Sequence, residues 1–168
     1  MELVRENDVR LRRICGVYTR DSEAAKDLYQ EILMQLWRAL PSFDGNAKPG
    51  TWVYRVALNT ALTRKRADTA RRAERHDSLD DTLDESQSLW PNESLTPDER
   101  LDAQQQLERL YVAIDRLDDL DKALVTLFLN DASYREMSHV LGISENHVAV
   151  KLHRIKKELA ARLAEDVP

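Results

Sequence analysis

The sequence predicts an all-α protein of two small helical domains joined by an acidic flexible linker, and three observations support this. Apolar residues recur at helical spacing in several stretches, and no stretch carries a strong strand signal. Leu, Ala, Arg, Glu and Asp are abundant, whereas the 168 residues include only 4 Gly and 5 Pro. The segment from about Glu74 to Glu93 is rich in Asp, Ser and Glu and lacks a sustained apolar period. We therefore expect domains at residues 1–72 and 96–168 and a linker at 73–95.

Three helices are expected in the N-terminal domain. The first covers residues 3–19, with one apolar side formed by Leu3, Leu11, Ile14 and Tyr18. Asp21 or Ser22 caps a second helix that runs to about Leu40. The core side of this helix is expected to be Ala25, Leu28, Ile32, Leu36 and Ala39. A loop over Pro41–Pro49 leads to a third helix, which starts at about Thr51 and continues into a basic tail.

The C-terminal domain is expected to begin with a strong helix start at Thr96-Pro97-Asp98-Glu99. The threonine caps the helix, the proline takes its first position, and the glutamate completes a capping box. This helix should end at about Arg116, and a short helix should follow across Lys122–Leu129.

The last segment, Ser133–Leu159, predicts two helices joined by a tight turn. Ser133 and Glu136 form a capping box, Gly142 sits where a left-handed residue ends a helix, and Ser144 caps the next one. In that second helix the expected core residues are Val148, Leu152, Ile155 and Leu159, and the expected outward residues are His147, Lys151 and Arg154. This pattern is typical of a helix-turn-helix whose second helix lies in a DNA groove. The alternative is a helix pair with a solvated basic face.

The charge distribution supports a nucleic-acid partner better than the net charge does. The net charge is −5, which by itself argues against DNA binding. Residues 1–72 carry 14 Lys+Arg against 9 Asp+Glu, however, whereas residues 73–102 carry 2 against 10. The acidic linker is either a solvated tether or a nucleic-acid mimic that competes for a basic channel.

The sequence argues against enzymes and membrane proteins. The four histidines lack ligand spacing, and we find no phosphate-binding glycine loop and no nucleophile motif. We therefore expect no enzyme activity, no cofactor, no metal and no small-molecule substrate. No apolar run reaches the length of a membrane span, and the N-terminus is too charged for a signal peptide, so a cytoplasmic protein without membrane insertion is expected. The single cysteine, Cys15, is either a core residue or a thiol sensor.

Two further surfaces are candidates for binding. The second helix has a mixed stripe of Asp27, Glu31, Met34 and Arg38, with Gln30 beside it, which is either a docking surface or a solvated face. Residues 42–66 interleave aromatic, amide and basic side chains, a combination that suits unstacked bases. Alternatively, Trp52 and Tyr54 are core aromatics and the nearby cations only solvate the helix.

Three segments in this order resemble the bacterial extracytoplasmic-function (ECF) sigma factors, the small two-domain branch of the housekeeping sigma family. They are Asp27–Leu40, Ser42–Leu62 and Ser133–Leu159. The resemblance implies an RNA polymerase sigma factor, which binds core RNA polymerase and directs promoter-specific initiation by recognising the −35 duplex and melting the −10 element. It implies three partners: core RNA polymerase, promoter DNA and an anti-sigma factor.

The resemblance also implies roles for individual residues. Those expected to bind core polymerase are Asp27, Gln30, Glu31, Trp37 and Arg38, of which the first three match a D-x-x-Q-E signature. Those expected at the −10 element are Trp52, Arg55, Asn59, Thr60 and Arg64. Those expected at the −35 element are Tyr134, Arg135, His147, Lys151 and Arg154.

The chain departs from the family at several positions. Ala149-Val150 stands where the family commonly has a basic residue and then serine, which removes a donor from a base-facing position. Asp44 stands where the loop often has arginine, and Pro49-Gly50 replaces a bulkier pair. Two other functions therefore stay open: a stand-alone helix-turn-helix regulator, and a sigma-like decoy that sequesters an anti-sigma factor.

Overall fold

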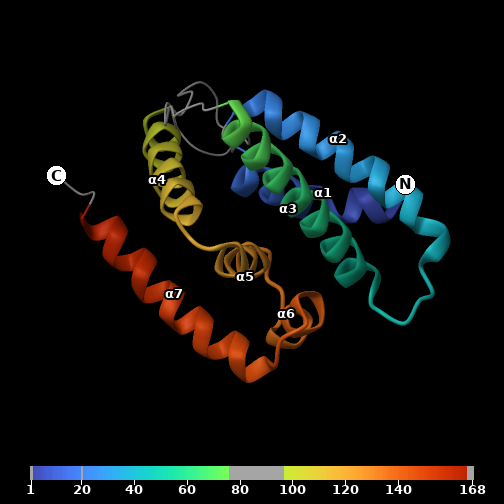
Figure 1. Cartoon of the computed structure of the whole chain (residues 1–168). Coiled ribbons are helices and arrows are strands. Elements are labelled where there is room, and N and C mark those ends of the chain that lie inside the picture. The colour runs from blue at the N-terminus through green and yellow to red at the C-terminus, as the bar shows by residue number, and fades with distance from the viewer. Residues whose placement is uncertain (1, 20, 76–96, 166–168) are drawn as a thin grey trace.

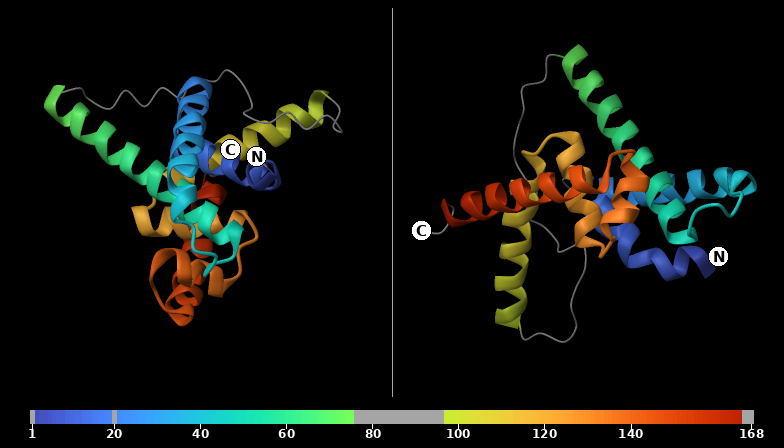
Figure 2. Two further views of the ribbon diagram at one scale, coloured as in Figure 1. Left: turned by 90° about the vertical axis from the view of Figure 1, so that its right-hand side faces the viewer. Right: turned by 90° about the horizontal axis from the view of Figure 1, so that it is seen from below.

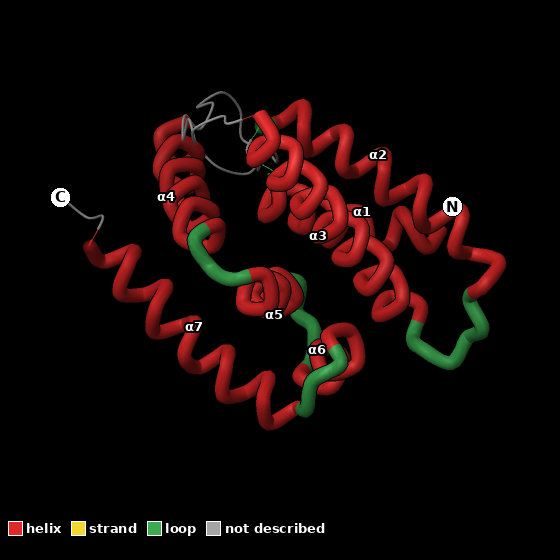
Figure 3. The backbone as a smooth tube through the Cα atoms, in the orientation of Figure 1, coloured by secondary structure: helices red, strands yellow, loops and turns green. Residues whose placement is uncertain are grey.

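The computed structural model describes residues 2–19, 21–75 and 97–165, and within these ranges it is helical with short loops and no strand (Figure 3). The described elements are α1 (Glu2–Tyr18), α2 (Ser22–Ala39), the 3-10 turn η1 (Leu40–Ser42), α3 (Pro49–Arg75), α4 (Pro97–Asp115), α5 (Asp119–Leu129), α6 (Tyr134–Leu141) and α7 (Glu145–Glu165). The predicted all-α class is confirmed. The predicted linker falls mainly outside the described residues, so the domain boundaries drawn around it stay a prediction.

The N-terminal half is a bundle of α1, α2 and α3, which pack on one another (Figure 1). Asp21, rather than Ser22, caps α2, because its carboxylate accepts a 2.6 Å hydrogen bond from the Ala24 N–H. The predicted core side of α2 is confirmed for Ala25, Leu28, Ile32 and Leu36, which are buried, whereas Ala39 is only partly buried against the core. α3 begins at Pro49, two residues before the expected Thr51, because proline is well suited to the first helical position.

The C-terminal half ends in the predicted helix-turn-helix, formed by α6 and α7. The Ser133 Oγ accepts from the Glu136 N–H at 3.3 Å, and the Glu136 carboxylate accepts from the Ser133 N–H at 2.9 Å. Gly142 has a φ of 69°, a left-handed conformation that glycine adopts without steric cost. Ser144 Oγ accepts from the His147 N–H, and the four predicted core residues of α7 are all buried. These local predictions are confirmed.

α5 starts three residues earlier than the sequence suggested. Asp118 caps it by accepting a 2.7 Å hydrogen bond from the Asp121 N–H, so the helix begins at Asp119 rather than near Lys122. The earlier start places Asp121 in the first turn of the helix, where a carboxylate is favoured by the unpaired N–H groups.

The two halves pack against each other, which the sequence did not predict. α1 and α3 contact α4, α5 and α6, and one apolar cluster includes residues of both halves (Figures 1 and 2). Polar groups also join them: Arg13 donates to the Leu129 carbonyl at 2.7 Å, and Lys65 pairs with Asp119 at 2.7 Å. The chain therefore adopts a closed arrangement in which its N-terminal bundle lies on its C-terminal helices.

The structure bears on the role of Cys15 and on the expectation of no membrane span. Cys15 is buried in α1, and this burial raises the pKa of its thiol to about 12. A thiol that stays protonated near neutral pH is a poor redox sensor, so the core interpretation of Cys15 is favoured. None of the described helices is long and apolar enough to cross a membrane.

Candidate functional site

The exposed side of α2 brings together the residues that the sequence assigned to core polymerase. Asp27, Gln30, Trp37 and Arg38 are exposed, and Glu31 is half-buried next to them. They lie on the side of the helix opposite its buried leucines and isoleucine, so the stripe is available to a partner without any change in the bundle.

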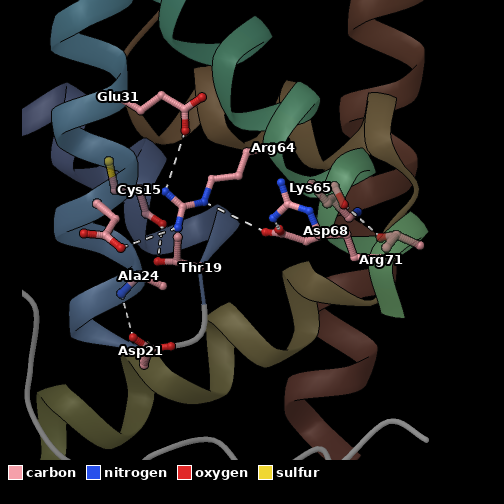
Figure 4. Close-up of polar contacts among 11 residues, drawn as sticks. Cys15, Thr19, Asp21, Ala24, Glu31, Arg64, Lys65, Asp68 and Arg71 are labelled. Atoms are coloured by element: carbon pink, nitrogen blue, oxygen red, sulfur yellow. Dashed lines mark hydrogen bonds and ion pairs between the residues drawn. The ribbon is translucent and has the colours of Figure 1, made fainter. Parts of the chain in front are cut away.

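Arg64 of α3 reaches this stripe and holds its two carboxylates (Figure 4). Its guanidinium lies 3.9 Å from Asp27 Oδ2 and 3.7 Å from Glu31 Oε2, and it also lies 3.9 Å from Asp68 on its own helix. The sequence assigned Arg64 to the −10 element. In the structure Arg64 also lies beside the acidic side of α2, so one cation links the two candidate surfaces, and its role at the −10 element stays a prediction.

The C-terminal end of α2 and the first residue of η1 carry an apolar patch, which we define as Met34, Trp37 and Leu40. All three side chains are exposed, and 75% of Trp37 is accessible to solvent. Residues three apart on a helix are neighbours, so the three side chains follow one another along the surface. Leu40 was not predicted as a binding residue because it was expected only to end the helix. Its place three residues after Trp37, and six after Met34, is nevertheless visible in the sequence.

The outward face of α3 carries part of the predicted −10 set. Arg55 and Asn59 are exposed four residues apart, and the same face continues with Thr63 and Arg66. A basic and amide face of this kind can contact phosphates and base edges. Thr63 and Arg66 were not assigned to the site, although their spacing from Asn59 would have indicated them.

Two other members of the −10 set point inward. Trp52 is 5% exposed and packs on Phe43, with ring centroids 5.1 Å apart. Thr60 is buried, and its hydroxyl donates to the Val56 carbonyl at 2.8 Å. Of the two interpretations left open for Trp52, its burial against Phe43 favours the core aromatic. A role on DNA stays a prediction, and it requires the ring to leave the core.

The loop between α2 and α3 is shaped by Asp44, one of the departures from the family. Its carboxylate accepts from the main-chain N–H of Asn46 at 3.0 Å and from the Asn46 side chain at 2.6 Å, and these bonds hold the pKa of Asp44 below its ordinary value. Gly45 between them has a φ of 75°. The aspartate therefore organises a local turn, where an arginine would present a cation.

The helix-turn-helix exposes four of its five predicted DNA-contacting residues, Tyr134, Arg135, His147 and Arg154. Tyr134 and Arg135 lie at the start of α6, and His147 lies near the start of α7. The N-terminal part of a second helix is the part that contacts base edges in this motif, so these positions suit groove binding.

Two of the five residues, Lys151 and Arg154, pair with Asp121 of α5. Lys151 Nζ donates to Asp121 Oδ1, and Arg154 donates to Asp121 Oδ2 at 2.6 Å. The Lys151 side chain is 16% exposed, whereas that of Arg154 is 63% exposed. Both residues were predicted to point outward. Lys151 instead lies at the edge of the core, because its position is about 60° from the buried Val148 around the helix.

A different set of residues lies at the centre of the exposed face of α7. Asn146, Val150, His153 and Lys157 follow one another at helical spacing and are all exposed. These four residues were not among the predicted DNA contacts, although they lie opposite the predicted core stripe. Val150, a departure from the family, is therefore a surface residue with 62% of its area accessible.

In the described part of the chain, no group of three or more His, Cys, Asp or Glu residues is arranged to hold a metal ion. The groups that the structure places on its surfaces are instead a carboxylate and apolar stripe on α2, a basic and amide face on α3, and the exposed face of a helix-turn-helix. These are groups for binding protein and nucleic acid.

Comparisons with known proteins agree with this pattern. Sigma-70 region 2 matches residues 3–72, and Sigma-70 region 4 matches residues 107–159. The ECF RNA polymerase sigma factor SigM of Bacillus subtilis is 27% identical over 85% of this chain and 82% of its own length. SigE of Mycolicibacterium smegmatis is 29% identical over 98% of this chain, which spans 61% of that longer protein.

A solved structure shares the fold. The sigma factor RpoE of Bartonella quintana, crystallised with the anti-sigma factor NepR, superimposes with a TM-score of 0.69 at 21% identity, over 98% of both chains. An all-α chain with a helix-turn-helix and these two regions is a transcription initiation factor. The chain belongs to the sigma-70 family, as an ECF sigma factor.

Proposed function

We propose that this chain binds core RNA polymerase through α2, opens the −10 element with α3 and holds the −35 duplex with α7. The observation that carries the proposal is the exposed stripe of α2, where an intact D-x-x-Q-E signature ends in the apolar patch of Met34, Trp37 and Leu40. The function is binding rather than catalysis, and it is exercised where the polymerase works, in the cytoplasm.

On α2, the residues proposed to contact core polymerase are Asp27, Gln30, Glu31, Trp37 and Arg38. An exposed tryptophan beside charged groups is the usual composition of a binding hot spot. The carboxylates give orientation, while Trp37 supplies the most exposed apolar side chain of the patch.

On α3, Arg55 and Asn59 are the members of the proposed −10 set that are already exposed in the closed arrangement. The amide can hydrogen-bond to base edges, and the guanidinium can contact phosphate or stack on a base. Trp52, Thr60 and Arg64 complete the set, and they become available only when the packing around α3 changes. Base capture also has to offset unstacking, which costs a few kcal/mol.

On the helix-turn-helix, the proposed −35 set is Tyr134, Arg135, His147 and Arg154, whereas Lys151 is mostly buried against Asp121. All four are exposed, and the first three lie at the N-terminal ends of α6 and α7. The net charge of −5 disfavours strong DNA binding by the free chain, so polymerase is expected to be needed for promoter recognition.

The closed arrangement has to open for this function. Promoter elements about 25 base pairs apart are separated by roughly 85 Å along B-form DNA. The longest described helix, α3, has 27 residues and spans about 40 Å. We infer that the halves separate on polymerase, and that an anti-sigma factor acts by holding them closed. The presence of an anti-sigma factor in the structure of the related fold supports this part of the proposal.

Binding to core polymerase tests the proposal. A fluorescently labelled chain is titrated with purified core polymerase, and the double variant Asp27→Ala with Gln30→Ala is compared with wild type. We expect a loss of affinity of at least thirtyfold, as for a hot spot worth about 2 kcal/mol. The matched control is Gln105→Ala with Glu108→Ala, which removes one amide and one carboxylate from exposed positions of α4. Equal affinity of wild type and the α2 variant would contradict the proposal.

A further inference from the structure

Asp121 is a buried carboxylate that joins α5 to the proposed DNA-reading helix. It is 3% exposed, and its two oxygens accept hydrogen bonds from different residues of α7, Oδ1 from Lys151 and Oδ2 from Arg154. The three charged groups therefore form one bridge, with its acidic member inside the domain and its basic members three residues apart on α7.

The fold supplies what a buried carboxylate needs. Asp121 lies in the first turn of α5, where the helix dipole favours a negative charge, and its N–H is occupied by the capping residue Asp118 at 2.7 Å. Burial of a single charge is costly, so the two cations from α7 are required to offset it. The same requirement fixes α7, because the helix cannot turn about its axis without leaving Asp121 unpaired.

The two cations are affected differently. Lys151 has three N–H donors on a side chain that is 16% exposed, so pairing with Asp121 keeps it at the edge of the core. Arg154 is 63% exposed and uses one side of its guanidinium on Asp121, which leaves further donors facing solvent. The Asp121 carboxylate thus keeps Lys151 away from the surface and fixes the orientation of the Arg154 guanidinium.

We propose that Asp121 is a positioning residue that sets the rotation of α7 and keeps Lys151 off the DNA, so that base reading falls to the exposed face of Asn146, Val150 and His153. This inference rests on the proposed function and revises the role that the sequence predicted for Lys151. The face offers an amide that suits adenine and an apolar side chain that suits the methyl group of thymine. A −35 element read by this face contains A·T pairs.

The test measures holoenzyme binding to promoter DNA with an intact or a scrambled −35 element, over a series of salt concentrations. In Asp121→Asn the negative charge is lost and an acceptor oxygen remains for only one of the two cations, so Lys151 and Arg154 become freer to contact phosphates. We expect the dependence of log affinity on log salt to steepen by about 1 to 2, since each phosphate contact adds about 0.9. We also expect preference for the intact −35 element to fall at least tenfold, while binding to scrambled DNA becomes tighter.

Asp119→Asn is the matched control, because it removes the same charge from the same turn of α5 but from a residue that pairs with Lys65 of α3. Its salt dependence and preference should equal those of wild type. If Asp121 only supported the fold, Asp121→Asn would weaken binding to both DNAs and leave the salt dependence unchanged, which would overturn the proposal.

A second variant keeps the proposal testable if Asp121→Asn fails to fold. Lys151→Met retains the aliphatic stem and leaves Arg154 on Asp121, so we expect salt dependence and −35 preference within about twofold of wild type. A salt dependence shallower by about 1 would show that Lys151 contacts phosphate and would overturn the proposal. Failure of wild-type holoenzyme to bind either DNA would instead count against the proposed function.

Discussion

The hydroxyl of Tyr54 on α3 donates a 2.9 Å hydrogen bond to the main-chain carbonyl of Asn130, where α5 ends. Both residues are buried, and they lie 76 positions apart in the chain. Tyr54 belongs to the helix proposed for the −10 element, and Asn130 directly precedes the helix-turn-helix. One buried bond therefore joins the two proposed DNA-binding parts in the closed arrangement.

Tyr54→Phe removes this bond and keeps the ring in place. We expect the closed form to lose about 1–2 kcal/mol of stability relative to the open form, because the Asn130 carbonyl is left buried without its donor. The population in which the halves are apart should rise about five- to thirtyfold.

Electron spin labels on the two halves measure this population. Thr69→Cys on α3 and Ala160→Cys on α7 are exposed attachment sites, and the buried Cys15 does not compete for the label. Tyr54→Phe should shift distances toward a longer, broader distribution. An unchanged distribution would show that the bond does not hold the halves together.

The ion pair between Lys65 and Asp119 gives the closed form a dependence on pH. The hydrogen bond from Lys65 lowers the pKa of Asp119 below the ordinary 3.8. A carboxylate with a depressed pKa in the folded state stabilises that state fully above its ordinary pKa, and the stabilisation is lost as the pH falls through the lower value.

We therefore expect Asp119→Asn to destabilise the closed form relative to the open form at pH 7. The change in free energy should be less than about 1 kcal/mol, because the pair is partly exposed. The difference from wild type should vanish as the pH falls below about 4. The same spin-label distances measure both effects. If the variant is as closed as wild type at pH 7, the ion pair does not stabilise the closed form.

The two tryptophans Trp37 and Trp52 should behave in opposite ways when replaced by alanine. Trp37 is 75% exposed, so Trp37→Ala should change stability by less than about 0.5 kcal/mol while weakening core polymerase binding about thirtyfold. Trp52 is in the core, so Trp52→Ala should cost about 3–5 kcal/mol of stability. Thermal melting and polymerase titration separate the two, and a strongly destabilised Trp37→Ala would refute the exposed position.

Arg64 links the acidic stripe of α2 to α3, so its replacement should lower the affinity for core polymerase. Arg64→Met leaves Asp27 and Glu31 without the cation that orients them, and we expect core binding to weaken about three- to tenfold. Arg66→Met, which removes an exposed cation from the same helix, should leave core binding unchanged. Equal effects of the two variants would indicate a general charge effect.

Local signals carried the sequence predictions that the structure confirms. Ser133 and Glu136 satisfy each other within one helical turn, and Gly142 ends α6 through its own backbone freedom. Such features depend on residues a few positions apart, so they can be recognised without knowing the fold.

The interactions that the sequence did not indicate are those between distant segments. Helical periodicity placed Lys151 outside the core stripe, but it could not show that a buried carboxylate 30 positions earlier would bind it. Likewise, Trp52 looked equally suited to bases and to the core, because its neighbour in space is set by the packing of the α2–α3 loop. The closed packing of the two halves belongs to the same class.

Protein-dependent initiation decides whether this chain acts as a sigma factor. Purified core RNA polymerase is given a pool of randomised promoters, with wild-type chain, with Asp27→Ala and Gln30→Ala together, or with no addition, and short abortive transcripts are measured. We expect transcripts only with the wild-type chain, from promoters that share −10 and −35 elements. If wild-type chain that is folded and bound to core gives no transcripts, the proposed function is wrong, and the decoy or the stand-alone regulator is favoured.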